Sequence, residues 1–298
     1  MPNVENTAAD LEGATAQFTA ARNRLFGIAY RMLGNRAEAE DIVQETWLRW
    51  QTCDRSVVED PAAYLATTTT RLAINVMQSA RARRETYVGP WLPEPVDTSA
   101  DPALGAERAE ALEFATLMLL EKLAPTERGA YVLREAFEYP YNQIADVLQI
   151  GEVNARQLVS RARKRLVSER REPTTLAEQR RLLEALVQAA QTGDLATLEE
   201  LLADDVVSYT DGNGMRGASR VPVVGKAVVA KYLKAFAPRF WPGTGLTWID
   251  ANGKAAVLIS RDAAVIALLT VSATSDGIDR IMWVLNPDKL ETISGLVR

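Results

Sequence analysis

The stretch from Tyr141 to Leu166 constrains the fold of this chain more than any other segment. Its sequence, YNQIADVLQIGEVNARQLVSRARKRL, begins with a short amphipathic segment and continues into a second, arginine-rich one. Between them stands Gly151, where we expect a turn that needs a backbone tolerant of unusual dihedral angles. Small Ala145 stands where two helices would have to cross closely. The stretch therefore predicts a helix-turn-helix.

The second segment of this motif has one basic face. We expect Leu158, Ala162 and Leu166 to face inward, which leaves the arginines and Lys164 to project outward. This is the geometry of a recognition helix in a DNA major groove, although a helical hairpin with a solvated cationic face stays an alternative. The residues best placed to reach base edges are Glu152, Asn154, Arg156, Gln157 and Ser160. The residues expected along the phosphates are Arg161, Arg163 and Lys164.

The composition excludes several classes of function. The 298 residues include no histidine, which removes histidine-based catalysis and histidine metal sites. A single Cys53 rules out an internal disulfide and fits a reducing cytoplasm. The net charge of −5 argues against a protein coated in nucleic acid, whereas a local basic face suits one contact with DNA. With neither a signal peptide nor an apolar run of membrane-spanning length, we expect a cytoplasmic protein without cofactor or metal.

Helical periodicity predicts an all-α domain over residues 14–86. In the segment AEAEDIVQETWLRW, an apolar stripe of Ile42, Val43 and Trp47 is expected to be buried. The opposite polar face carries Asp41, Gln44, Glu45 and Arg49. A third helix opens at Asp60-Pro61, where an N-cap precedes a proline, and it becomes basic towards its end.

Two of these segments resemble a known family. AEDIVQETWLRW and PAAYLATTTTRLAINVMQSARARRETY resemble the region-two domain of extracytoplasmic-function sigma factors, and the helix-turn-helix falls where their region-four domain belongs, within 107–170. The resemblance implies that the polar face with Asp41, Gln44, Glu45 and Arg49 docks on RNA polymerase, and that the recognition helix reads the −35 element. It also implies a −10 element contact, for which the candidates are Arg71, Asn75, Gln78, Arg81, Arg83 and Arg84. Two departures are Gln149, in place of the usual turn glycine, and Ala155, in place of a β-branched residue.

Residues 87–106 are expected to form a proline-rich linker with the motif WLPEP. Beyond it and the helix-turn-helix domain, residues 174–298 read as helices followed by a curved antiparallel sheet, an α+β domain. The pattern GDLATLEELLADDVVSYTDGNG resembles SnoaL-like domains, which share the cone fold of nuclear transport factor two. The fold class expected is therefore two all-α helical domains followed by an α+β SnoaL-like cone domain, as in one subgroup of these sigma factors.

We expect the C-terminal domain to fold back on the linker, since Trp91 and Leu92 are apolar and have no obvious local partner. The turn Asp211–Arg216 and the segment Asn286–Leu290 are the expected contacts, with Arg216 pairing with Glu94. The residues assigned to this regulatory contact are Trp91, Leu92, Pro93, Glu94, Pro95, Asp211, Gly212, Gly214, Arg216, Asn286, Pro287, Asp288, Lys289 and Leu290.

The function expected is that of an alternative sigma factor, whose partners are core RNA polymerase and promoter DNA. A one-component helix-turn-helix regulator with a ligand-sensing C-terminal domain stays an alternative, as does a small ligand in that domain. Catalysis is not expected, although Asp211 near a cone lined by Trp241, Trp248 and Trp283 would suit a buried general base.

Overall fold

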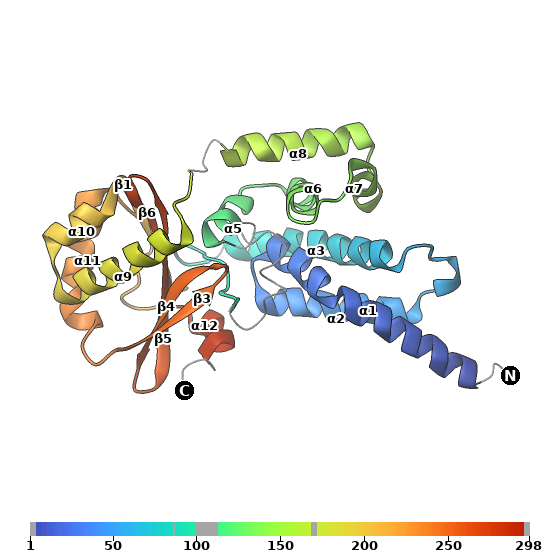
Figure 1. Cartoon of the computed structure of the whole chain (residues 1–298), viewed down its shortest axis with the longest axis horizontal. Helices are drawn as coiled ribbons and strands as arrows, with labels where there is room; N and C mark the ends of the chain where they lie inside the picture. Colours follow the sequence, from blue (N-terminus) through green and yellow to red (C-terminus); the bar gives the residue numbers. More distant parts are fainter. Residues whose placement is uncertain (1–3, 86, 99–112, 168–171, 295–298) are drawn as a thin grey trace. The chain divides into compact units, whose positions relative to one another are not determined.

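The computed structural model describes residues 4–85, 87–98, 113–167 and 172–294, which form two compact units (Figure 1). The first unit comprises Met1–Ala82, Ala106–Ala111 and Leu119–Ser168. The second comprises Arg83–Gly105, Leu112–Met118 and Glu169–Arg298. The described part of the predicted linker, residues 87–98, thus belongs to the C-terminal unit.

In the described residues of the first unit, all secondary structure is helical. Its elements are α1 (Val4–Leu33), α2 (Arg36–Thr52), the 3-10 turn η1 (Arg55–Val57), α3 (Pro61–Glu85), α6 (Pro125–Glu135), α7 (Tyr141–Leu148) and α8 (Glu152–Val167). Helix α5 (Phe114–Leu120) begins in the second unit and ends in the first. No helix in the described ranges is long and apolar enough to cross a membrane.

Two buried arginines join α1 to α6 in the first unit. The guanidinium of Arg128 is fully buried and donates from Nε and Nη2 to the carbonyl oxygen of Arg31, at 3.1 and 2.9 Å. Its Nη1 pairs with Glu121. Burial lowers the pKa of Arg128 to about 9, so its charge persists near neutral pH. The Arg31 guanidinium stacks over the ring of Phe137 at 5.0 Å. These contacts tie the C-terminal helices of this unit to its N-terminal ones.

The second unit is an α+β domain around one six-stranded sheet of order β2-β1-β6-β5-β4-β3. The strands are β1 (Leu202–Asp211), β2 (Val223–Val224), β3 (Gly245–Ala251), β4 (Lys254–Arg261), β5 (Ala264–Thr274) and β6 (Gly277–Val284). The helices are α9 (Leu176–Thr192), α10 (Leu195–Leu201), α11 (Lys226–Phe240) and α12 (Pro287–Ser294).

Both faces of this sheet are buried. Side chains alternate between the two faces, so Val257 and Leu269 lie in one core while Leu258 and Leu268 lie in the other. The first core packs against α9, α10 and α11. The second packs against α12 (Figure 1), and it includes Phe114 at the start of α5 and Leu92 of the linker. Burial on both sides explains why β4 and β5 are continuously apolar and do not alternate.

The sheet is mixed, and the expectation of a wholly antiparallel sheet is wrong. Strands β3 to β6 pair antiparallel as expected, but β1 runs parallel to β6, with Ser208 opposite Ile281 and Asp211 opposite Val284. Between β1 and β6 the chain passes through α11 and four strands, and it returns beside β1 in the same direction. Because β1 and β6 are parallel neighbours, their C-terminal ends lie side by side. Asp211, at the end of β1, therefore lies next to the segment that follows β6.

Candidate functional site

The helix-turn-helix is present, with an unusual residue at its turn. Helix α7 ends at Gln149, whose φ of 54° and ψ of 46° are left-handed, and the N–H of Ile150 donates to the carbonyl oxygen of Ala145 at 3.0 Å. Gln149 thus takes the conformation that glycine usually takes, at a strain of about 1 kcal/mol. Gly151 is not among the residues with positive φ, so the expectation that it supplies the unusual dihedral is wrong.

Helix α8 buries one face and exposes the other. Its buried residues are Ala155, Val159, Ala162 and Leu166, whereas Leu158, expected to face inward, is half-buried. The helical period of 3.6 residues selects Val159 for the inner stripe, together with Ala155 and Ala162. All eight residues predicted to contact DNA are exposed: Glu152, Asn154, Arg156, Gln157, Ser160, Arg161, Arg163 and Lys164.

Some of these cations are paired within the first unit. Arg156 forms an ion pair with Glu152 at 2.5 Å and lies over the ring of Tyr141 at 4.6 Å. Arg163 pairs with Glu135 at 2.6 Å, and this hydrogen bond raises the pKa of the Arg163 guanidinium. These pairs are largely exposed to solvent and contribute little to stability, so a phosphate can replace the carboxylate at small cost.

Helix α2 presents the predicted polar face. Asp41, Gln44 and Arg49 are exposed, and Glu45 is half-buried and pairs with Arg49 at 2.8 Å. The inner face holds Ala39, Ile42, Val43, Thr46 and Trp50. Trp47, expected to be buried, is only half-buried and packs on Phe18 with ring centroids 4.9 Å apart. The fully buried tryptophan is Trp50, whose Nε1 donates to the carbonyl oxygen of Ala14 at 3.1 Å.

The predicted −10 contacts lie along α3. Asn75 and Gln78 are exposed. Arg71, by contrast, donates from Nε to the carbonyl oxygen of Val147 at 2.8 Å and from Nη2 to that of Asp146 at 2.9 Å, and so caps the C-terminus of α7. Arg81, Arg83 and Arg84 belong to the last turns of α3, and their side chains lie outside the described residues.

In the second unit, a buried carboxylate holds the linker. Asp211, fully buried at the end of β1, accepts the backbone N–H of Leu92 at 2.7 Å and the ammonium of Lys289 at 2.7 Å on Oδ2. Its Oδ1 accepts the Tyr87 hydroxyl at 2.5 Å. Lys289 also donates to the carbonyl oxygen of Leu92 and lies 4.3 Å from the centre of the Trp91 ring. We call this group, Tyr87, Trp91, Leu92, Asp211 and Lys289, the linker clamp.

The clamp keeps the Tyr87 phenol protonated. Burial first, and then the hydrogen bond to the Asp211 carboxylate, raises the pKa of Tyr87 well above its usual range. The phenol therefore stays a donor at neutral pH, and it also accepts a hydrogen bond from Nδ2 of Asn286 at 3.0 Å. The N–H groups of Leu285 and Asn286 donate to the carbonyl oxygen of Asp211 at 2.7 and 2.9 Å, which fixes the start of α12 beside the clamp.

A second set of contacts holds the linker further along. The N–H of Val96 donates to Oδ1 of Asn252 at 2.9 Å, and the N–H of Asn252 donates back to the carbonyl oxygen of Val96 at 2.9 Å. Thr98 donates its N–H to the carbonyl oxygen of Asp250 at 3.0 Å. Leu92, Pro93, Glu94, Pro95 and Val96 are all buried. The linker thus lies along the β3–β4 turn as an added piece of backbone.

The structure brings most of the predicted regulatory residues to this site. Gly214 donates its N–H to the carbonyl oxygen of Val88 at 3.1 Å, and Leu290 lies in the same core as Leu92. The expected pair between Arg216 and Glu94 is wrong: Glu94 is buried, while Arg216 is exposed. The carboxylate that Lys289 contacts is that of Asp211, because the hydrogen bonds from Leu285 and Asn286 to the Asp211 carbonyl oxygen hold the start of α12 beside the end of β1. Pro287 and Asp288 form the first turn of that helix, and Gly212 is buried.

Sequence reasoning missed Tyr87 and Asn252. Tyr87 is the first residue of the predicted linker, four positions before Trp91, and could have been found as a second aromatic residue of that segment. Asn252 precedes Gly253, and an Asn-Gly pair in a sequence predicts no more than a hairpin turn. In the structure, Oδ1 of Asn252 also accepts a hydrogen bond from the backbone N–H of Val96 in the linker.

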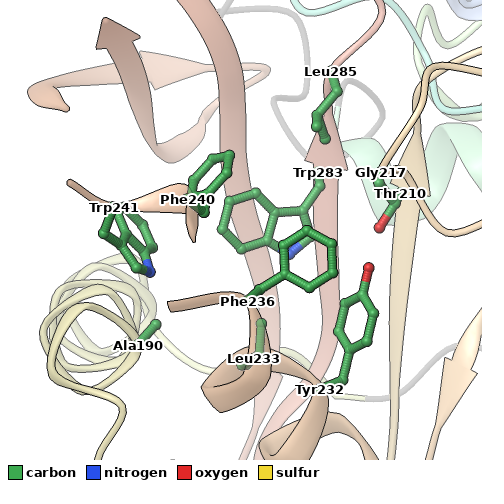
Figure 2. Close-up of a pocket in the computed structure, with 10 residues that line it drawn as sticks. All are labelled: Ala190, Thr210, Gly217, Tyr232, Leu233, Phe236, Phe240, Trp241, Trp283 and Leu285. Carbon is green, nitrogen blue, oxygen red and sulfur yellow. The ribbon is translucent and has the colours of Figure 1, made fainter. Parts of the chain in front are cut away.

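A separate cavity of about 40 Å³ lies between α9, α11 and the sheet (Figure 2). Its lining residues are Ala190, Thr210, Gly217, Tyr232, Leu233, Phe236, Phe240, Trp241, Trp283 and Leu285. Trp241 and Trp283 line it as expected, whereas Trp248 is 36% exposed on β3. Asp211 is not part of the lining, because its carboxylate is directed at the linker. Among the residues that the structure describes, no cluster of acidic or cysteine side chains could hold a metal ion.

We expect Lys289→Met to open the linker clamp. Removing one partner of a buried ion pair leaves the Asp211 carboxylate uncompensated, at a cost of about 3–5 kcal/mol. Hydrogen–deuterium exchange at the Leu92 amide should become faster, and proteases should cleave residues 87–98 sooner. The matched control is Lys226→Met, which removes an ion pair to the exposed Asp204 and should change neither readout. Equal protection of the Leu92 amide in wild type and Lys289→Met would contradict the clamp.

Two stretches of the chain match known protein families. Residues 18–84 match the family described as sigma-70 region 2, and residues 114–166 match sigma-70 region 4. The chain is 37% identical over 291 residues to the ECF RNA polymerase sigma factor SigJ of Mycobacterium tuberculosis H37Rv, covering 92% of each chain. It is 31% identical to a protein named Probable ECF RNA polymerase sigma factor SigI of strain CDC 1551, covering 94% of this chain and 95% of the relative.

The architecture agrees as well. A crystal structure of the M. tuberculosis extracytoplasmic function sigma factor SigJ superposes with a TM-score of 0.76 and 33% sequence identity, covering 93% of this chain and 98% of that one. The alternative of a one-component regulator is not favoured, because such a regulator has no need of a region-two domain. The chain belongs to the extracytoplasmic-function family of RNA polymerase sigma factors.

Proposed function

We propose that this protein is an alternative sigma factor whose C-terminal unit controls promoter engagement through the linker clamp. The family assignment supports binding to core RNA polymerase and promoter DNA in the cytoplasm. The observation that carries the regulatory part is that the chain between region two and region four supplies Leu92 to the core of the C-terminal sheet. The linker, which connects the two DNA-binding regions, is therefore part of the C-terminal domain.

The linker clamp limits how much of the chain between region two and region four is free to extend. Fully extended, residues 87–98 would span about 40 Å. Held by Asp211, Asn252 and Lys289, they lie along the C-terminal unit and add no free length between the two regions. Because the effective concentration of one tethered module near another depends on linker length and stiffness, the clamp changes how readily both regions engage one promoter.

We infer that the C-terminal unit works by contact and not by catalysis. The carboxylate that would have suited a general base, Asp211, is saturated by the Leu92 amide, the Tyr87 hydroxyl and the Lys289 ammonium. None of the ten residues that line the cavity is charged. The cavity thus offers no acid–base pair to a substrate.

The polar face of α2 is proposed to dock on polymerase. We expect the double variant Asp41→Lys, Glu45→Lys to lose binding to core polymerase, because complementary charge steers such docking. Both side chains are solvent-accessible, so circular dichroism should show an unchanged fold. The control is Glu12→Lys, Glu59→Lys, which makes the same change in net charge at exposed positions off this face. Retention of polymerase by the α2 variant in a pull-down would refute the assignment.

The exposed face of α8 is proposed to divide into base and phosphate contacts. Arg156→Ala should weaken promoter binding by about 1–3 kcal/mol and relax the preference at one base pair of the −35 element. Lys164→Ala should weaken binding to all sequences alike and lower the salt slope by about one. Fluorescence anisotropy with a set of single-base variants at several salt concentrations separates the two effects. If both variants lost affinity uniformly, the division would be wrong.

The linker clamp is proposed to set transcription output. Run-off transcription with core polymerase should differ between wild type and Lys289→Met. Trp91→Ala should shift it in the same direction by a smaller amount, since it removes the ring contact with Lys289 and leaves the ion pair between Lys289 and Asp211 in place. Lys226→Met should match wild type. Should Lys289→Met free the linker without any change in transcription, the clamp would be structural and not regulatory.

A further inference from the structure

The cavity of the C-terminal unit has one polar end in an otherwise aromatic lining. Figure 2 shows the rings of Phe236, Phe240 and Trp283 gathered around the space, with the hydroxyl groups of Tyr232 and Thr210 turned toward each other at one side. Burial raises the pKa of the Tyr232 phenol even though Thr210 hydrogen-bonds to it, so the phenol stays neutral. Two hydroxyls that bond to each other still keep one hydrogen and free lone pairs for a third group.

The size and lining of the cavity define what fits. The cavity leaves about 40 Å³ open to the centres of water molecules, which is room for roughly three of them. Three water molecules together occupy about 90 Å³, close to the volume of one six-membered ring. Phe240 and Trp283 meet edge to face, at 5.5 Å and 85°, which leaves ring faces and edges for a planar guest. Charged guests are disfavoured, since no lining side chain carries a charge to offset their desolvation. Phe236 and Gly217 are exposed and give the cavity a rim open to solvent.

The cavity shares its framework with the linker clamp. Thr210 lines the cavity, and the next residue on β1, Asp211, holds the linker on the opposite face. Leu285 also lines the cavity, and its N–H donates to the carbonyl oxygen of Asp211 at 2.7 Å. The loop from Asp211 through Gly217 connects the two sites directly. A guest that shifts the ends of β1 and β6 therefore acts on the backbone that carries the clamp.

We propose that this cavity is a binding site for a small, uncharged, single-ring molecule bearing a hydroxyl group, and that its occupancy alters the hold of the clamp on the linker. The coupling half of this inference rests on the clamp described above. The geometry requires that the ring lie among Phe240, Trp241 and Trp283 and that the hydroxyl reach the Thr210–Tyr232 pair.

Phenol is the probe, added to the full-length protein labelled with nitrogen-15. The indole N–H signals of Trp241 and Trp283 should shift on titration, whereas that of Trp248, exposed on β3, should not. Benzoate tests the exclusion of charge, and indole tests the limit on size; both should bind more weakly than phenol. Tyr232→Phe keeps the ring and removes the hydroxyl, so it should weaken phenol binding about 5–10-fold. No shift of Trp241 and Trp283, or equal affinity for benzoate, would overturn the site.

The coupling is measured on the same protein without polymerase. Saturating phenol should change hydrogen–deuterium exchange at the Leu92 amide at least about twofold in wild type, and at the same phenol concentration the change should be smaller in Tyr232→Phe. Binding without any change at Leu92 would overturn the coupled site. Neither readout uses transcription, so failure here is distinct from failure of the proposed function, which is judged by Lys289→Met in the run-off assay.

Discussion

The second unit depends on one buried carboxylate. Asp211 has no access to water, and its charge is tolerated because Lys289, the Tyr87 hydroxyl and the Leu92 amide all point at it. A buried ion pair of this kind adds little stability over an apolar pair of equal shape, but removing one partner is expensive. Its value is specificity: only the linker, in one register, completes the hydrogen bonding of Asp211. The clamp thus selects one position for a segment that its prolines leave extended.

The same contact explains why the sheet can be apolar on both faces. Helices α9, α10 and α11 cover one face, and without the linker the opposite face would expose Leu258, Leu268 and Val284 around α12. Leu92 and Phe114 fill part of that second core. Linker and sheet therefore stabilise each other. The proposed regulation of promoter engagement uses the same burial of Leu92 that stabilises the fold.

The first unit uses several of its cations internally. Arg71 caps α7, and Arg156 and Arg163 pair with carboxylates of their own unit. The exposed pairs of Arg156 and Arg163 are weak, because water competes for both partners. Arg71 is held more firmly, by two carbonyl oxygens at a helix C-terminus. Arg156 and Arg163 can therefore exchange a carboxylate for a phosphate at little cost. For Arg71 to contact DNA, its hydrogen bonds to the C-terminal carbonyl oxygens of α7 would have to break.

The sequence by itself determined the helix-turn-helix, the polar face of α2, and the order of helices before strands in the C-terminal domain. It also indicated that WLPEP meets the Asp211 turn. Tertiary structure alone decided the parallel pairing of β1 with β6, the pairing of Lys289 with Asp211, and the part played by Tyr87 and Asn252. Local periodicity and turn chemistry act over a few residues. The clamp instead joins Leu92 to residues 119 and 197 positions away, and such pairings depend on how the whole sheet closes.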